Sequence, residues 1–462
     1  MATATLVQLL YLAASVLFIF GLVGLGNPET GRRGILMAEI GMLAAVVGTL
    51  LHADIITYQW IFIGILLGSV IGTVMALKIP MTKMPERIAL SHAFGGLAVA
   101  LVGISEYHHR GLGAQMTTLQ ISATSAEVFL GGLTFTGSLM AFGKLQGVIG
   151  GKPFTYPGQN TINYILIAAA LATVAYVVYN PTAQIVFFGC CVAGLALGVL
   201  LVLPIGGADM PVVICLLNSY AGLAASAAGF ALNNNVLIIC GALDGGSGFI
   251  LGMMMSKAMN RSFYNVVFGA FGATPDAAPG QPVNEGPAPN EGTIDDAVDI
   301  LRAASSLIVI PGYGMAVSQA QHAVRDLATA LKDNGCLVRY AIHPVAGRMP
   351  GHMNVLLAEA DIPYDQLFDL DAINDDFGQT DVALIVGAND VVNPAAKTNP
   401  GSPIYGMPVF NVEAAKSVII LKRSLNPGFA GIENALFVKP NTMMVLGDAK
   451  KTLMAFASHL DD

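Results

Sequence analysis

Nine apolar runs, each about twenty residues long, fill most of the first 262 residues of this chain. About twenty apolar residues is the length that an α-helix needs to cross the hydrocarbon core of a bilayer. The sequence therefore predicts a polytopic α-helical membrane bundle. We centre the nine spans near Ser15, Met42, Leu66, Gly96, Thr134, Ala170, Gly194, Gly222 and Gly248.

The first run, from about residue 6 to residue 25, has the position of a secretory signal peptide. It lacks the basic segment that precedes the apolar region of such a peptide, and no clear cleavage site follows it. We therefore interpret it as a retained span.

Charged residues divide the chain into two unlike parts. Residues 1–262 contain ten Lys or Arg and eight Asp or Glu, whereas residues 263–462 contain twelve and twenty-two. The net charge of −8 argues against nucleic acid as a partner, because phosphate binding needs a basic surface. We expect a transmembrane domain over 1–262, a flexible Pro-, Gly- and Ala-rich linker over 263–292, and a soluble domain over 293–462.

The basic residues of the membrane part predict its orientation. Nine of them fall in alternate connections between spans, and Arg110 alone lies in the opposite set. Because cytoplasmic loops carry the excess of Lys and Arg, we expect the C-terminal domain in the cytoplasm and the N-terminus on the far side. The nine are Arg32, Arg33, Lys78, Lys83, Arg87, Lys144, Lys152, Lys257 and Arg261.

Small residues are frequent within the spans, as in GGLTFTGSLMAFG (131–143) and GALDGGSGFILG (241–252). Glycines three and four residues apart allow helix backbones to approach closely. They predict a compact bundle rather than a wide pore.

A few polar residues interrupt the spans, and a charge at the bilayer centre costs about 3 kcal/mol on insertion scales. The imidazole of His92 titrates near neutral pH, so His92 is a candidate proton carrier; the alternative is a neutral ring bonded to a neighbouring helix. Asn218 could bond across helices or join a hydrated relay. The remaining polar positions are Ser138, Asp209 and Asp244, with Glu39 and Glu127 nearer the span ends.

Asp209 has a second interpretation, because it directly precedes Met210 and Pro211. Proline suits the first turn of a helix, and aspartate is a preferred N-cap. The residue could therefore cap a span rather than carry protons.

The five cysteines have no metal-ligand spacing, and four of them lie in apolar runs. Buried free thiols are the expected state of such residues. We predict neither disulfides nor a metal site for Cys190, Cys191, Cys215, Cys240 and Cys336.

Beyond the linker, apolar strand patterns alternate with helix patterns, which predicts a Rossmann-like α/β domain with a parallel sheet covered on both faces. We expect helices over 315–333, 352–360 and 449–460. The expected strands are SLIVIPG (306–312), CLVRYAIHP (336–344), DVALIVGAND (381–390), MPVFNV (407–412), SVIILKRS (417–424) and TMMVLGD (442–448).

A glycine motif follows the first of these strands. In PGYGMAVSQAQ, Gly312 and Gly314 match G-x-G-x-x-[GA], with Val317 in place of the third small residue. A strand before the motif and a helix after it favour dinucleotide binding over a structural turn. Gly312 would allow a tight turn, and Gly314 would let a pyrophosphate approach the backbone.

The ends of two other strands favour NADP(H) over NAD(H). An NAD site normally has Asp or Glu at the end of the second strand, but RYAIHP has no acid there. Positive charge is available at Arg348 and at Lys422, Arg423 and Ser424, a set that suits a 2′-phosphate.

Taken together, these segments resemble the β subunit of the proton-translocating NAD(P) transhydrogenases over nearly the whole chain. The motifs that carry the resemblance are SHAFGGLA, TFTGSLMAFGKL, GGADMPVV, LNSYAG, PGYGMAV, HPVAGRMPGHMNVLLAEA, VGANDVVNPAA, GMPV, LKRS and LGDAK.

The resemblance implies reversible hydride transfer between NADH and NADP⁺, coupled to proton movement across a bacterial inner membrane. It implies NADP(H) on this chain, NAD(H) on a separate α subunit, and a dimer of αβ units. One nucleotide fold cannot pass hydride between two nicotinamides, so a partner is also required on chemical grounds.

The resemblance also implies roles for single residues. His92, Ser138 and Asn218 form the proton path, Asp209 stands at the junction of membrane and soluble domains, and Asp390 senses or relays protonation. Asp244 and Glu39 match no family motif. The implied NADP(H) contacts are Gly312, Tyr313, Gly314, Met315, Ala316, Val317, Val345, Ala346, Gly347, Arg348, Met349, Pro350, Gly387, Ala388, Asn389, Asp390, Val391, Gly406, Met407, Lys422, Arg423, Ser424, Leu425, Asn426, Pro427, Gly428, Phe429, Asp448 and Ala449.

Phe429 departs from the family pattern, which usually has Tyr there. A stacking role would survive that change, whereas a role for the hydroxyl would not. Two rival functions remain open at this point: a transporter or channel gated by a cytoplasmic nucleotide-sensing domain, and a membrane anchor for a soluble reductase.

Overall fold

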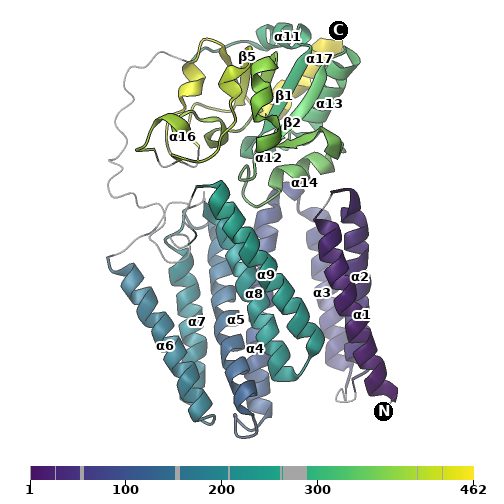
Figure 1. The fold of residues 1–462 in the computed structure, drawn as a ribbon, viewed down its shortest axis with the longest axis vertical. Coiled ribbons are helices and arrows are strands. Elements are labelled where there is room, and N and C mark those ends of the chain that lie inside the picture. Colours follow the sequence, from purple (N-terminus) through teal and green to yellow (C-terminus); the bar gives the residue numbers. More distant parts are fainter. Residues whose placement is uncertain are drawn as a thin grey trace. The chain divides into compact units, whose positions relative to one another are not determined.

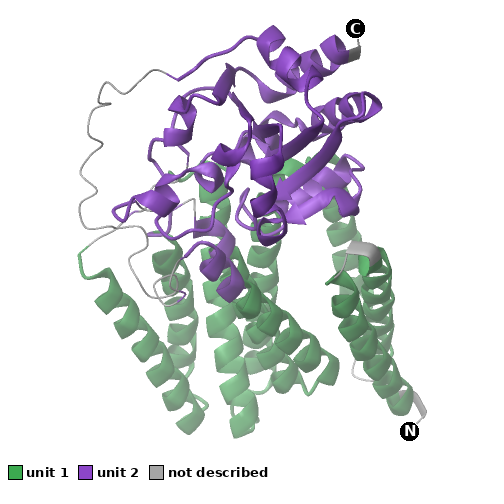
Figure 2. Cartoon of the chain, turned by 45° about the horizontal axis from the view of Figure 1, so that its top comes forward, with its two compact units in different colours: residues 1–150, 156–203, 213–251 green, residues 151–155, 204–212, 252–462 purple. Residues whose placement is uncertain are grey.

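The structure is a computed structural model that describes residues 2–26, 28–52, 57–150, 154, 157–206, 209–260, 263, 289–402, 404–428 and 430–461. Lys152, Arg261, Phe429 and residues 264–288 of the predicted linker lie outside the described residues. The chain divides into two compact units (Figure 2). The first comprises residues 1–150, 156–203 and 213–251, and the second comprises 151–155, 204–212 and 252–462.

Nine helices among the described residues are long and apolar enough to cross a membrane. Each contains one of the centres that the sequence predicts, so the nine predicted spans are confirmed as helices (Figure 1). Their bounds are α1 (Ala2–Leu25), α2 (Pro28–Leu50), α3 (Gln59–Lys78), α4 (Met84–His109), α5 (Thr118–Leu145), α6 (Gln159–Tyr179), α7 (Gln184–Val202), α8 (Met210–Leu232) and α9 (Asn235–Ala258). The short 3-10 helix η1 (Met81–Lys83) precedes α4.

Close helix contacts in the first unit depend on small residues. Helix α1 packs on α2, and α5 packs on α4 and α7. A Cβ atom on Gly96 of α4 would lie 2.9 Å from the carbonyl oxygen of Gly131 on α5, so this crossing requires glycine. The packing that the glycine spacing predicts is therefore present at this crossing.

The second unit contains a six-stranded parallel sheet with the order β3-β2-β1-β4-β5-β6. This order is that of the dinucleotide-binding Rossmann fold, so the predicted Rossmann-like fold is confirmed. The strands are β1 (Ser306–Pro311), β2 (Leu337–Ile342), β3 (Leu367–Asp369), β4 (Val382–Val386), β5 (Ser417–Lys422) and β6 (Thr442–Leu446).

Both faces of the sheet are buried, and alternate residues of each strand supply them. On one side α17 packs against α11, α13 and β5 (Figure 1). On the other, Ile308, Ile385 and Ile420 join a core with Phe377 and Phe410 that is covered by short turns of helix. The helices and turns of this unit are α11 (Ile294–Arg302), α12 (Tyr313–Ser318), α13 (Gln321–Asp333), α14 (His352–Glu359), η3 (Tyr364–Gln366), α15 (Leu370–Ile373), η4 (Asn374–Gln379), η5 (Asp390–Val392), α16 (Ala395–Thr398), η6 (Val412–Ala414), η7 (Ala435–Val438) and α17 (Ala449–Asp461).

Two predictions about this unit are wrong. MPVFNV (407–412) is not a strand: its backbone bonds to the Asn374 side chain, which donates to Val409 O (3.2 Å) and accepts from Asn411 N (2.7 Å). The third strand is instead the short β3. The predicted helix over 315–333 is two helices, α12 and α13, because Gln319 adopts a left-handed conformation with φ of 51° between them.

Candidate functional site

The predicted nucleotide contacts gather at one edge of the sheet. Gly312–Val317 follow β1, Val345–Pro350 follow β2, and Gly387–Val391 follow β4. Lys422 ends β5, and Asp448 follows β6. The carboxyl ends of parallel strands meet at the same edge, and ligands of such sheets bind where the strand order reverses, here between β1 and β4.

The loops after β1 and β4 touch directly. Gly314 N donates to Gly387 O (2.9 Å), and a Cβ on Gly314 would lie 2.6 Å from Gly387 Cα. Gly387 itself has a φ of 67°, which favours glycine. The motif predicts that Gly314 makes room for a pyrophosphate, but a side chain at this position would instead meet the loop after β4. Both glycines are thus explained by the contact between the two loops.

The loop after β2 folds around a histidine that the sequence analysis missed. Arg348 N donates to Nδ1 of the buried His352 (3.1 Å), and the guanidinium of Arg348 lies 4.2 Å from the ring centroid of Tyr313. Gly347 has a φ of 106°, which allows the loop to turn over His352. This arrangement holds a cation against the aromatic residue of the glycine motif. No pattern in the sequence predicts that Arg348 N bonds to the His352 ring.

Asp390 connects the loops after β4 and β5. Its Oδ2 accepts a hydrogen bond from Ala430 N (3.1 Å). Asn434, which the sequence analysis also missed, donates from Nδ2 to the carbonyl oxygen and to Oδ1 of Asn389, both at 3.1 Å. Asp390 therefore fixes the segment that follows β5 over the end of β4.

The two predicted phosphate-binding cations differ in their surroundings. Lys422 donates from Nζ to Asn426 O (2.7 Å) and lies 4.8 Å from the Phe437 ring centroid, whereas Arg423 is exposed. Burial lowers the pKa of Lys422, and the charge of Asp390 opposes that change. An exposed guanidinium beside a partly buried ammonium fits a phosphate at the end of β5.

No carboxylate stands at the end of β2, where His343 follows the strand. The His343 ring donates from Nε2 to Pro408 O (2.7 Å) and accepts from Val345 N at Nδ1 (3.2 Å). Burial lowers the pKa of His343 to about 4, so the ring is neutral near pH 7. This position cannot bond a ribose 2′-hydroxyl as an acidic residue would, which agrees with the preference for a 2′-phosphate.

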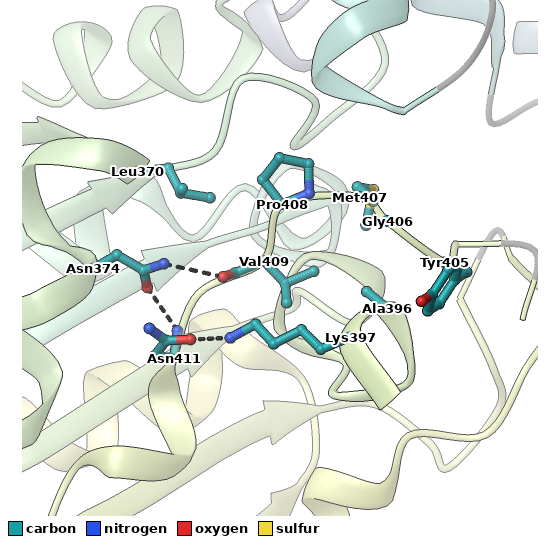
Figure 3. A pocket seen from close by; sticks show the side chains of 10 residues that line it. All are labelled: Leu370, Asn374, Ala396, Lys397, Tyr405, Gly406, Met407, Pro408, Val409 and Asn411. Carbon is teal, nitrogen blue, oxygen red and sulfur yellow. Dashed lines mark hydrogen bonds between the residues drawn. The ribbon is translucent and has the colours of Figure 1, made fainter. Parts of the chain in front are cut away.

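Two of the predicted NADP(H) contacts line a pocket that contains none of the others, and a third predicted contact caps a helix. Gly406 and Met407 line a pocket of about 440 Å³ together with Lys397, Asn374 and Asn411 (Figure 3). Of the predicted contacts only these two line it. Asp448 caps α17, because its Oδ1 accepts from Lys451 N (3.1 Å).

The first unit brings together two of the predicted proton-path residues. The Asn218 side chain on α8 interacts with the His92 ring on α4, and it donates from Nδ2 to Oδ1 of Asp244 on α9 (3.0 Å). Asp244, which matched no motif, is therefore part of this cluster.

Two other predicted residues lie outside that cluster. Ser138 on α5 is fully buried, and among the described residues its hydroxyl has no hydrogen-bond partner. Asp209 is buried directly before α8, as a helix-start residue would be. It precedes Asn218 by nine residues, or roughly 13 Å of helix rise. Glu39 is exposed on α2.

The cysteines are free, as predicted, although Cys191 and Cys240 are only partly buried. The described residues contain no group of three His, Cys, Asp or Glu side chains arranged to hold a metal ion.

Comparison with known proteins gives the family. A sequence profile described as "NAD(P) transhydrogenase beta subunit" matches residues 7–459. NAD(P) transhydrogenase subunit beta of Rhodospirillum rubrum is 49% identical to this chain over 454 residues, which cover 97% of this chain and 98% of that protein. A second NAD(P) transhydrogenase subunit beta from the same species has the same identity to this chain and the same coverage. The chain belongs to the NAD(P) transhydrogenase β subunit family.

Family membership decides between the functions that the sequence left open. This β subunit is part of an oxidoreductase that works with an α subunit, and its family uses NAD(H) and NADP(H). Its apolar helices agree with a membrane-associated subunit. The gated channel and the simple membrane anchor are therefore not needed to explain the two units.

Proposed function

We propose that this β subunit binds NADP(H) at the carboxyl edge of its sheet while the α subunit binds NAD(H). Hydride passes between the two nucleotides, and the helix bundle moves protons through His92 as it does so. The bundle lies in the bacterial inner membrane with the C-terminal domain in the cytoplasm, and two αβ units form the enzyme. Residues 1–262 form the transmembrane domain, residues 263–292 the linker and residues 293–462 the NADP(H)-binding domain.

The observation that carries the NADP(H) assignment is the distribution of charge along the sheet edge. Lys422 and Arg423 stand at the end of β5, and the end of β2 has the neutral His343 in place of an acid. A 2′-phosphate needs the positive charge at the end of β5, whereas a ribose 2′-hydroxyl normally needs the acidic residue that the end of β2 lacks.

Each part of the chain then has a defined task. Bound NADP(H) supplies the nicotinamide that accepts or gives the hydride. The loops after β1 and β4 position the nucleotide, and Asp390 holds the loop after β5 against them. In the membrane, His92 takes up a proton beside Asn218 and releases it when the bundle changes state. Coupling requires that protonation and nucleotide redox state favour the same conformers, by a reciprocal free energy.

Steady-state kinetics of the αβ enzyme test the assignment. Loss of a charged hydrogen bond to phosphate costs roughly 1.5–3 kcal/mol, or about ten- to a hundredfold in affinity. We expect Arg423→Ala to raise the KM for NADP(H) by that factor and to leave the KM for NAD(H) unchanged. Arg325→Ala, which removes a partly exposed arginine paired with Asp326 on α13, is the matched control. An unchanged KM for NADP(H), or equal changes in both values, would contradict the assignment.

A further inference from the structure

Asp244 is a carboxylate within an apolar helix, and its position needs an explanation. An aspartate in the middle of a span costs about 3 kcal/mol on insertion scales unless it has partners or water. Asp244 lies ten residues into the 24-residue helix α9 and is exposed at the surface of the described helices. The side chain therefore lies outside the packed interior of the bundle, where a carboxylate needs a polar partner.

The Asn218 amide supplies a partner on the inner side. Both hydrogen bonds that Asn218 Nδ2 donates go to Asp244, one to Oδ1 (3.0 Å) and one to the main-chain oxygen (3.3 Å). The amide oxygen is then the atom that remains to accept from the His92 ring, with which Asn218 also interacts. The carboxylate thus determines which way the amide points.

The helix contact leaves the amide little freedom. A Cβ on Gly248, one turn beyond Asp244, would lie 2.9 Å from Asn218 Nδ2 and 2.9 Å from Cys215 O. Only the bare backbone of α9 at this point leaves space for the Asn218 side chain to reach Asp244.

The charge of Asp244 also acts on the imidazole, which lies within its electrostatic reach. Few other ionisable groups lie near. Cys240 lies one turn before Asp244 and interacts with it, and the main-chain oxygen of Cys215 on α8 lies beside Gly248. On α4, Glu86 and Arg87 precede His92 by roughly 8 Å of helix rise. Glu127 of α5 contacts α4 at Gly103, roughly 16 Å beyond His92. Tyr220 lies two residues after Asn218, on another face of α8.

We propose that Asp244 is a positioning residue for proton transfer: it holds the Asn218 amide with its oxygen toward His92 and provides the negative charge that a protonated ring needs. This inference rests on the proposed proton-handling function of His92. It assigns a role in the proton path to a residue outside the motifs that carry the resemblance described above.

The pH profile of proton-coupled turnover tests the proposal. The αβ enzyme is reconstituted in phospholipid vesicles, and NADPH oxidation and lumen acidification are followed from pH 5.5 to 9. Because an opposite charge nearby favours the protonated ring, we expect Asp244→Asn to move the pH of half-maximal coupled turnover down by about one unit. Asp244→Glu retains the charge and should stay near the original profile. Gly246→Ala is the matched control, since a Cβ there meets nothing within 4 Å.

A purely structural role for Asp244 would lower activity equally at every pH and would not be rescued by glutamate. If Asp244→Asn does not assemble, Asp244→Ser provides a second neutral variant. Coincident profiles for the neutral variants and the unmodified enzyme would overturn the proposal. A His92→Ala enzyme that still acidifies the lumen would instead overturn the underlying function, so the two failures are distinguishable.

Discussion

His343 allows a quantitative test of the stability of the second unit. The folded state lowers the pKa of this buried ring from 6.5 to about 4. Between these two values the unfolded chain binds more protons than the folded chain, so stability falls as the pH falls from 6.5 toward 4 and is unaffected by this residue above 6.5. At 1.36 kcal/mol for each pKa unit, the loss amounts to about 3 kcal/mol at pH 4.

Replacing His343 by Asn removes this titration and retains an amide that can donate to Pro408 O. We expect the pH-dependent loss to shrink by most of that amount. Hydrogen exchange of the β1 and β4 amides in the full chain measures the opening free energy, with rates corrected for the intrinsic effect of pH. His322→Asn, which removes an exposed histidine of α13, is the control. Equal pH dependence in His343→Asn and the unmodified chain would refute the reasoning.

Three further predictions follow from particular contacts. Gly248→Ala should reduce coupled turnover at least tenfold, because its Cβ would displace the Asn218 amide, whereas Gly246→Ala should retain it; equal vesicle acidification by both would contradict the contact. Asp381 accepts from Lys416 Nζ, Ser305 N and the Ser306 hydroxyl, which lower its pKa to about 2. Asp381→Asn should therefore destabilise the unit by about 1–3 kcal/mol in denaturant titrations at pH 7, and the difference should vanish as the pH falls from 3.8 through 2. Asp390→Ala should raise the KM for NADP(H) about tenfold, since Ala430 N loses its acceptor, without changing that for NAD(H).

The helices and most strands were predictable because their hydrophobic patterns are long and strong. The runs centred on Ser15 to Gly248 admit one interpretation, and the strands after 305, 336, 381, 416 and 441 are continuous apolar segments. The errors concern short-range conformation. Residues 407–412 have the composition of a strand, but their backbone bonds to the Asn374 side chain. Nothing in the sequence predicts the left-handed conformation of Gln319.

The sequence marks candidate site residues where a motif indicates the chemistry, and it gives no signal for contacts that only the folded chain creates. Gly312, Gly314 and Lys422 were recognisable from spacing and charge. His352 and Asn434 were not: no pattern marks the bond that His352 accepts from Arg348 N within the loop after β2, and Asn434 meets Asn389 only when two separate loops come together. Asp244 was visible as a polar residue in a span, but its contact with Asn218 depends on how α8 and α9 face each other.

The most direct test of the account is proton movement by enzyme that lacks the His92 imidazole. The αβ enzyme and its His92→Ala variant are placed in the same vesicles, and lumen pH is recorded while NADPH reduces NAD⁺. The account predicts a pH gradient with the unmodified enzyme and none with the variant, although the variant still binds NADP(H). A gradient of equal size and rate in both would contradict the central role of this histidine.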